Sequence, residues 1–124
     1  MKKNKINKII EDSILIKRKL IKSKIIINAI IHYSDIITKS ISEGGKLILC
    51  GNGGSAADAQ HLAAELLIRL RPHINRSSIP ALSLATDTST ITACGNDYSF
   101  NSIYSRVLES LGNQKDILIC IQLQ

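Results

Sequence analysis

Hydrophobic residues follow two patterns along the chain, and the first of them predicts two helices at the N-terminus. Isoleucine and leucine recur mostly at spacings of three or four between residues 6 and 21, with lysines between them. Ser23 can cap a second helix with a broad apolar face. The pair Gly44-Gly45 is typical of the end of such a helix. We therefore expect an N-terminal helical hairpin over residues 1–43.

From residue 46 onward, short apolar runs alternate with helical segments. The run from Lys46 to Cys50 is typical of a strand that is buried on both faces of a parallel sheet. The pattern predicts strands at 46–50, 79–85 and 117–123, and helices at 56–70, 88–94 and 102–111. We expect an α/β fold in three α-β-α layers, with a Rossmann-like parallel sheet over 46–124, as one partial domain covering 1–124.

The sequence stops at Gln124, directly after the third predicted strand. Ligands of open α/β sheets bind beyond the carboxyl ends of the strands, and here no loop follows the third strand. We therefore expect an incomplete sheet in which a central strand is uncovered, as in the front part of a larger domain. An uncovered strand exposes unpaired backbone groups, so aggregation or marginal stability is expected.

The composition fits one globular domain, because 44% of the 124 residues are hydrophobic and 21% are charged. The net charge of +6 at first suggests a nucleic-acid partner. However, residues 1–24 hold nine Lys and Arg against two acids, and the remaining residues have a net charge of −1. The lysines are interpreted as a solvated helix face, without interleaved aromatic residues to stack on bases. We expect no nucleic-acid partner.

Cysteine usage and hydropathy indicate a cytoplasmic protein. The three cysteines, Cys50, Cys94 and Cys120, are widely spaced and form no CxxC pair. The most apolar stretch, residues 25–41, is interrupted by polar residues and is too polar to span a bilayer. No signal or transit peptide is expected, and no membrane partner.

A glycine-rich turn at residues 51–55, GNGGS, joins the first predicted strand to the next helix. Glycines at this position allow positive φ angles and a close approach of a ligand. The amide groups at the start of the helix carry a partial positive charge that favours phosphate. A tight turn capped by Ser55 explains the same residues, so the turn alone leaves both interpretations open.

His61 and Glu65 are four residues apart on the same predicted helix, so they share one face. Both are possible Zn²⁺ ligands, and the carboxylate could act as a general base. The spacing alone favours an ordinary surface pair. Two ligands also leave a zinc site incomplete, so others must come from elsewhere.

Asn96 and Asp97 lie in a predicted loop, Gly95-Asn96-Asp97, after the second strand and its short helix. Their amide and carboxylate groups could bind hydroxyls of a polyol. A simple turn explains the same residues, and on this evidence alone it is favoured.

Taken together, these segments resemble the sugar isomerase (SIS) domain, and specifically the phosphoheptose isomerase family. The resemblance is carried mainly by residues 47–67, LILCGNGGSAADAQHLAAELL. Shorter stretches agree at 79–84 (IPALSL), 95–101 (GNDYSFN) and 103–106 (IYSR). The GNGGSAADAQH segment is long enough to make a chance match very improbable.

The resemblance implies isomerisation of sedoheptulose 7-phosphate to D-glycero-D-manno-heptose 7-phosphate through an enediol, for lipopolysaccharide biosynthesis. It implies one Zn²⁺ per subunit and a homotetramer with sites at subunit interfaces. Glu65 would be the general base and a metal ligand, and His61 a second metal ligand. The substrate would be contacted by these residues: Asn52, Gly53, Gly54, Ser55, Glu65, Asn96 and Asp97.

The resemblance weakens at the C-terminus, where Gln122-Leu123-Gln124 replaces the family's Ser/Thr-rich phosphate loop. The Gln and His that complete the family's metal site are expected farther along a chain than residue 124. The alternative function is a non-catalytic SIS-type protein that binds a phosphosugar or a replication initiator. Glu65 argues against this alternative, because the initiator-associating relatives lack that acidic residue.

Overall fold

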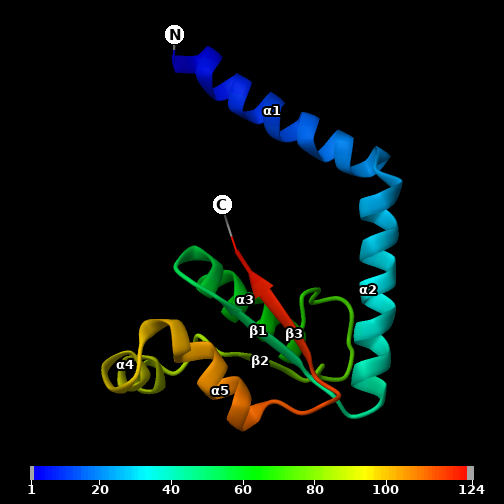
Figure 1. The fold of residues 1–124 in the computed structure, drawn as a ribbon. Coiled ribbons are helices and arrows are strands. Elements are labelled where there is room, and N and C mark those ends of the chain that lie inside the picture. The colour runs from blue at the N-terminus through cyan, green and yellow to red at the C-terminus, as the bar shows by residue number, and fades with distance from the viewer. Residues whose placement is uncertain (1, 123–124) are drawn as a thin grey trace. The chain divides into compact units, whose positions relative to one another are not determined.

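The structure is a computed structural model and describes residues 2–122. Its helices are α1 (Lys2–Lys22), α2 (Lys24–Ser42), α3 (Gly54–Leu67), α4 (Thr88–Asp97) and α5 (Ile103–Leu111), with a 3-10 turn η1 at Phe100–Ser102 (Figure 1). Its strands are β1 (Leu47–Gly51), β2 (Ala81–Ser83) and β3 (Ile117–Ile121). The chain divides into two compact units, one up to Ile36 and one from Ile37 onward.

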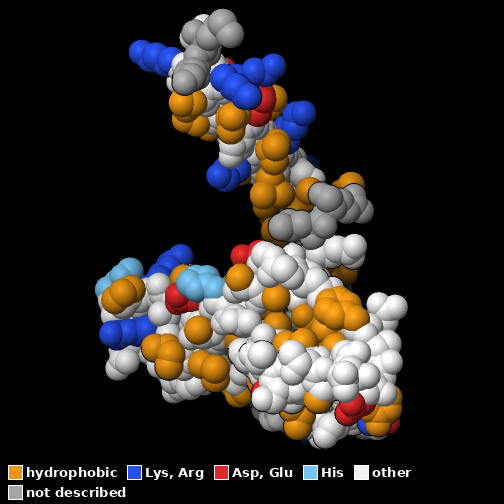
Figure 2. All heavy atoms as spheres, turned by 90° about the vertical axis from the view of Figure 1, so that its left-hand side faces the viewer, with side chains coloured by type: hydrophobic (Ala, Val, Ile, Leu, Met, Phe, Trp, Pro, Cys, Tyr) orange, Lys and Arg blue, Asp and Glu red, His pale blue; other side chains and the backbone are white. Residues whose placement is uncertain are grey.

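The first unit consists of α1 and most of α2, which are the two helices expected from the sequence. The backbone N–H of Ile26 donates to Ser23 Oγ at 3.4 Å, so Ser23 caps α2 as expected. The large hydrophobic side chains of this unit are exposed among its lysines, and Figure 2 shows both kinds over its surface. The unit ends at Ile36, and not at residue 43, because Ile37 and Ile41 pack against the core of the second unit.

The second unit is built on a parallel sheet in the order β2-β1-β3. All five residues of β1 are buried, which confirms the prediction of a strand covered on both faces. Among the described strands β1 is the central one and β3 lies at an edge, so one side of β3 is unpaired, as expected for an incomplete sheet. Strand β1 pairs with a neighbour on each side, whereas β3 pairs only with β1 among the described strands.

Side chains of β1 alternate between two cores, and this alternation creates three layers. Leu47 and Leu49 pack against Ala59 and Ala63 of α3. Ile48 and Cys50 point to the opposite face, toward Leu84 and three residues of α5, Tyr104, Val107 and Leu108. The predicted α-β-α layering is therefore confirmed, with α3 and α5 on opposite faces of β1 (Figure 1).

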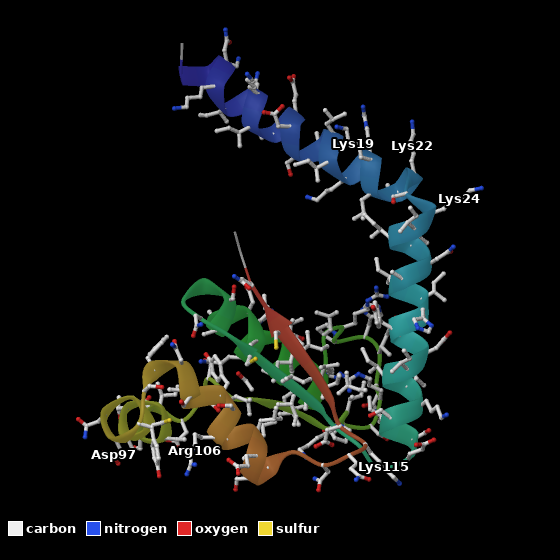
Figure 3. The ribbon with its side chains drawn as sticks, in the orientation of Figure 1. Lys19, Lys22, Lys24, Asp97, Arg106 and Lys115 are labelled. Atoms are coloured by element: carbon white, nitrogen blue, oxygen red, sulfur yellow. The ribbon has the colours of Figure 1, made fainter. Side chains whose placement is uncertain are left out.

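The amino ends of β1 and β3 are closed by a network of polar contacts. Asp116, whose side chain is 6% exposed, accepts hydrogen bonds from Lys46 Nζ at 2.6 Å and from the Lys46 N–H at 2.9 Å. The Asn113 N–H adds a third at 2.8 Å, and Ser40 Oγ donates to the Lys115 carbonyl at 2.6 Å. Figure 3 shows Lys115 at this end of the sheet.

The ionisation of Asp116 reflects two opposed effects. Burial acts to raise the pKa of this carboxyl, while the hydrogen bonds and charge of Lys46, with the Asn113 N–H, act to lower it. The bonds prevail, and the pKa of Asp116 lies below its ordinary value.

The helix boundaries differ from the sequence expectation at α3 and α4. Helix α3 ends at Leu67, where residue 70 was expected, because the Arg76 guanidinium binds the carbonyls of Glu65 and Leu66 at 2.7 and 2.9 Å. The predicted loop Gly95-Asn96-Asp97 is wrong, since these residues form the last turn of α4. A hydrogen bond of 3.0 Å from the Tyr98 N–H to the Cys94 carbonyl closes that turn.

None of the helices in the described part of the chain combines the length and the apolar character needed to cross a membrane.

Candidate active site

The GNGGS turn joins the end of β1 to the first turn of α3, and the backbone is tightly packed at Gly51. A Cβ atom at Gly51 would lie 2.7 Å from the Ser55 carbonyl oxygen and 2.8 Å from that of Ile121. Gly53 adopts φ +57°, which disfavours residues with a side chain. The N–H of Ser55 donates to the Asn52 carbonyl at 3.1 Å, so α3 begins immediately after the turn. Glycine is therefore required at these two positions by geometry.

Ser55 is the buried polar residue of this turn. The residue is 3% exposed. Among the described residues its hydroxyl has no hydrogen-bond partner, and no fully buried side-chain oxygen or nitrogen is unpaired, so this hydroxyl is open to solvent. The hydroxyl does not cap α3 either, because Gly53 is the N-cap residue and no side chain bonds to that helix end. A hydroxyl that is open to solvent can donate to a ligand, and the first N–H groups of a helix attract anions. An anion bound at this point would accept hydrogen bonds from the Ser55 hydroxyl and from the first N–H groups of α3.

An open cleft of about 540 Å³ lies at the carboxyl ends of β1 and β3, beside the start of α3. Its wall contains three predicted site residues, Asn52, Gly54 and Ser55. The remaining residues that line it are Cys50, Gly51, Tyr104, Cys120, Ile121 and Gln122. Ligands of open α/β sheets bind at this edge, so the cleft is the candidate active site.

Tyr104 is a cleft residue that the sequence did not single out. Its hydroxyl donates to the Gly51 carbonyl, and this bond holds α5 against the glycine turn. Burial and the nearby Cys50 raise the pKa of the phenol, while the bond to Gly51 acts in the opposite direction. Tyr104 therefore stays protonated at neutral pH and acts as a donor. The IYSR motif contains it, but only the packing of α5 on β1 reveals its position.

His61 and Glu65 lie one turn apart on α3, as predicted, but outside this cleft. The distance from His61 Nε2 to Glu65 Oε1 is 3.7 Å, and their side chains are 71% and 27% exposed. Glu65 follows Ser55 by ten residues, which is about 15 Å along a helix axis. Within the described residues, Glu65, the predicted base, therefore lies far from the glycine turn.

The zinc site implied by the resemblance is incomplete in the described residues. Within residues 2–122 no three His, Cys, Asp or Glu side chains come together in a way that could hold a metal ion. His61 and Glu65 are suitable donors, but a zinc site takes at least three protein ligands. These two residues alone do not fit a complete metal centre.

Asn96 and Asp97 lie in a different place from the cleft. Asn96 Nδ2 donates to Asp97 Oδ1 at 2.9 Å, and both residues are exposed at the end of α4. Asp97 lines a second hollow of about 440 Å³ together with Arg106 of α5, and Figure 3 shows both residues on the same side of the molecule. A negative charge at a helix C-terminus is unfavourable, so helix stability does not explain Asp97.

The comparisons with known proteins agree with this arrangement. The SIS domain family matches residues 11–123. A phosphoheptose isomerase from Chlorobaculum parvum is 54% identical over 84 residues, which is 68% of this chain and 40% of the relative. One from Clostridium acetobutylicum is 42% identical over 119 residues, which is 96% of this chain and 60% of the relative. The chain thus spans roughly half the length of such relatives.

Two solved structures resemble the whole chain. A phosphoheptose isomerase from Francisella tularensis superposes with a TM-score of 0.89 at 35% identity, and one from Neisseria gonorrhoeae with 0.87 at 33%. Both comparisons cover 100% of this chain, and they cover 63% and 62% of the respective solved chains. The resemblance found in the sequence is confirmed, and the chain belongs to the SIS domain family.

Proposed function

We propose that the protein is a phosphoheptose isomerase that converts sedoheptulose 7-phosphate to D-glycero-D-manno-heptose 7-phosphate. The observation that carries this proposal is the cleft at the carboxyl ends of β1 and β3, with Ser55 unpaired among the described residues. A phosphate there would accept hydrogen bonds from the Ser55 hydroxyl and from N–H groups of the first turn of α3. The names of the relatives support a sugar phosphate as the ligand.

The reaction needs a base that transfers a proton between C1 and C2 of the sugar. We assign this role to Glu65, whose carboxylate would remove the C1 proton of the ketose and deliver a proton to C2 of the enediol. Donors around the C1 and C2 oxygens must stabilise the charge that develops on them. Asn96 and Asp97 would hold other hydroxyls of the substrate.

The separation of these residues supports a site that is completed by other subunits. Glu65 lies about 15 Å along α3 from Ser55, and Asp97 lines a different hollow. We propose a homo-oligomer, and specifically a tetramer. His61 and Glu65 would then contribute two ligands to one Zn²⁺ per subunit, with the others supplied from outside the described residues. Sedimentation with and without added zinc tests both the assembly and its dependence on the metal.

We place the reaction in the cytoplasm, at the entry of heptose biosynthesis for lipopolysaccharide. The three cysteines are free, and none forms a disulfide in the structure, as is usual for proteins in a reducing compartment.

The direct test is conversion of sedoheptulose 7-phosphate in the presence of Zn²⁺, with the Glu65→Gln variant beside the wild type. Loss of the base is expected to lower kcat at least about 100-fold. Glu109→Gln is the matched control, because Glu109 is an exposed carboxylate on α5 whose ion pair with Arg106 is 4.0 Å long. An unchanged kcat in Glu65→Gln would contradict the role of Glu65.

Binding measurements separate the isomerase from the non-catalytic alternative. Sugar-phosphate binding that depends on Ser55, without any conversion by the wild-type protein, would contradict the isomerase and support a phosphosugar-binding function.

A further inference from the structure

Cys50 and Cys120 form a pair of thiols in the wall of the cleft. Cys50 is in the central strand β1 and Cys120 is in β3, and the two residues are direct partners in the register of these strands. The Cys50 thiol donates a hydrogen bond to Cys120 Sγ, and the two sulfur atoms are 3.5 Å apart. No part of the proposed isomerisation uses either thiol.

The backbone geometry at this pair suits a disulfide. Neighbouring strands lie about 4.8 Å apart, which falls within the range of about 4.4–6.8 Å found between the Cα atoms of disulfide-bonded cysteines. Partner residues in a parallel pair point to the same face of the sheet. The sulfur atoms need to approach from 3.5 Å to a bonding distance of about 2.0 Å, which side-chain rotation can supply.

The two thiols differ in their access to solvent. Cys120 is exposed, whereas Cys50 is buried. Burial raises the pKa of the Cys50 thiol to about 11, and Cys120 contributes through its hydrogen bond and its charge. An oxidant therefore reaches Cys120 first, and Cys50 is placed to react with the modified Cys120.

We propose that Cys50 and Cys120 are an oxidation site that forms a disulfide across β1 and β3, with a small-molecule disulfide such as oxidised glutathione as the oxidant. The Cys120 thiolate attacks one sulfur of the oxidant, so the oxidant S–S bond breaks and one glutathione thiolate leaves. The Cys50 thiol then loses its proton to solvent and attacks Cys120 Sγ. The Cys50–Cys120 bond forms as the second glutathione leaves and takes up a proton.

This exchange balances, because two cysteine thiols lose two electrons and oxidised glutathione gains them as two glutathione molecules. The new bond ties the edge strand to the central strand one residue before Gly51 and the glycine turn. Oxidation therefore cross-links the wall of the cleft without adding a group to it. Closing so long a loop of chain is expected to stabilise the folded state.

The test is treatment of the folded protein with oxidised glutathione, followed by thiol counting and peptide mapping. The wild type should lose two of its three thiols and two hydrogen atoms in mass, and the map should contain a 50–120 cross-link. The thermal midpoint should rise by about 5 °C or more after oxidation. Formation of the bond should accelerate as the pH rises from 7 to 9, since the Cys50 thiolate is the second nucleophile.

Three variants make the result specific. Cys94→Ser is the matched control, because Cys94 is buried in α4 and bonds weakly to the Ser99 carbonyl at 3.9 Å. It should form the cross-link as the wild type does. Cys50→Ser should stop at a glutathione adduct on Cys120, and Cys120→Ser should leave Cys50 unmodified.

Two outcomes would overturn the proposal. One is a wild type that keeps a glutathione adduct on Cys120 without the 50–120 bond. The other is a cross-link whose formation lowers the thermal midpoint, since a strained bond would mean that this register does not suit a disulfide.

Discussion

The two ends of the β1–β3 strand pair differ in how their polar groups are satisfied. At the amino end, Asp116 accepts three hydrogen bonds, one of which is also its ion pair with Lys46, and Ser40 donates to the Lys115 carbonyl. At the carboxyl end, the Ser55 hydroxyl has no hydrogen-bond partner among the described residues and is open to solvent. One end is closed by internal bonds, and the other leaves donors facing a cleft.

This difference separates residues that stabilise the fold from residues that bind a ligand. A buried polar group with partners contributes to stability, whereas a hydroxyl that is open to solvent and has no protein partner contributes little and is available to a ligand. We therefore expect substitutions at the amino end to change unfolding and substitutions at the carboxyl end to change binding.

The largest effect is expected for Asp116→Ala. The change removes three hydrogen bonds, two of them from Lys46, and leaves the Lys46 ammonium without its carboxylate. The free energy of unfolding should fall by about 2–3 kcal/mol, measured by urea denaturation. Glu109→Ala, on the exposed face of α5, should change it by less than about 0.5 kcal/mol. Equal losses in the two variants would contradict the importance of the closed end.

Gly45 and Gly51 lie at opposite ends of the β1–β3 strand pair, so the effect of a change to alanine can be compared between the two ends. A Cβ atom would lie 2.3 Å from the Lys115 carbonyl oxygen at Gly45 and 2.7 Å from the Ser55 carbonyl oxygen at Gly51. Each change to alanine should cost about 1–3 kcal/mol of unfolding free energy, because backbone atoms must move.

Only Gly51→Ala should also weaken binding of the sugar phosphate, measured by calorimetry. Gly54→Ala is the control for stability at the same turn, since a Cβ atom there meets nothing within 4 Å and should leave the unfolding free energy nearly unchanged. Weaker binding in Gly45→Ala would show that the two ends are not independent.

The acid dependence of stability should come in part from Asp116 at the amino end of the strand pair. Because the pKa of Asp116 is lower in the folded protein than its ordinary value of 3.8, its contribution is complete above pH 3.8. It is lost as the pH falls through the folded pKa, since the unfolded state then binds more protons. Urea unfolding between pH 6 and 2.5 should show a smaller acid dependence in Asp116→Asn than in the wild type. Identical slopes would exclude Asp116 as a source of acid sensitivity.

The smallest effect on stability, with a large effect on binding, is expected for Ser55→Ala. Its hydroxyl has no partner among the described residues, so its removal should change the unfolding free energy by less than about 0.5 kcal/mol. Binding of the sugar phosphate should weaken about tenfold or more. Ser40→Ala should behave oppositely, with a loss of about 1 kcal/mol in stability and unchanged binding. If Ser55→Ala is destabilised but binds the sugar phosphate as the wild type does, Ser55 serves stability and not binding.

Much of the fold could be predicted from local patterns in the sequence. The apolar run before GNGGS predicts β1, because a short uninterrupted run of this kind is typical of a strand buried on both faces. The predicted glycine turn is confirmed, with a positive φ at Gly53. The loop predicted from Gly95 is wrong, because α4 continues to Asp97 despite the cost of a glycine in a helix.

The amino-acid sequence by itself determined the order of the elements, the glycine turn and the SIS resemblance, because these depend on residues close together along the chain. Only the tertiary structure decided which distant residues meet. It places Cys50 beside Cys120 and Tyr104 against Gly51, and it brings Lys46 and Asp116 together in an ion pair. Each of these contacts joins residues separated by more than fifty positions, so strand register and helix packing create them, and no local pattern encodes them.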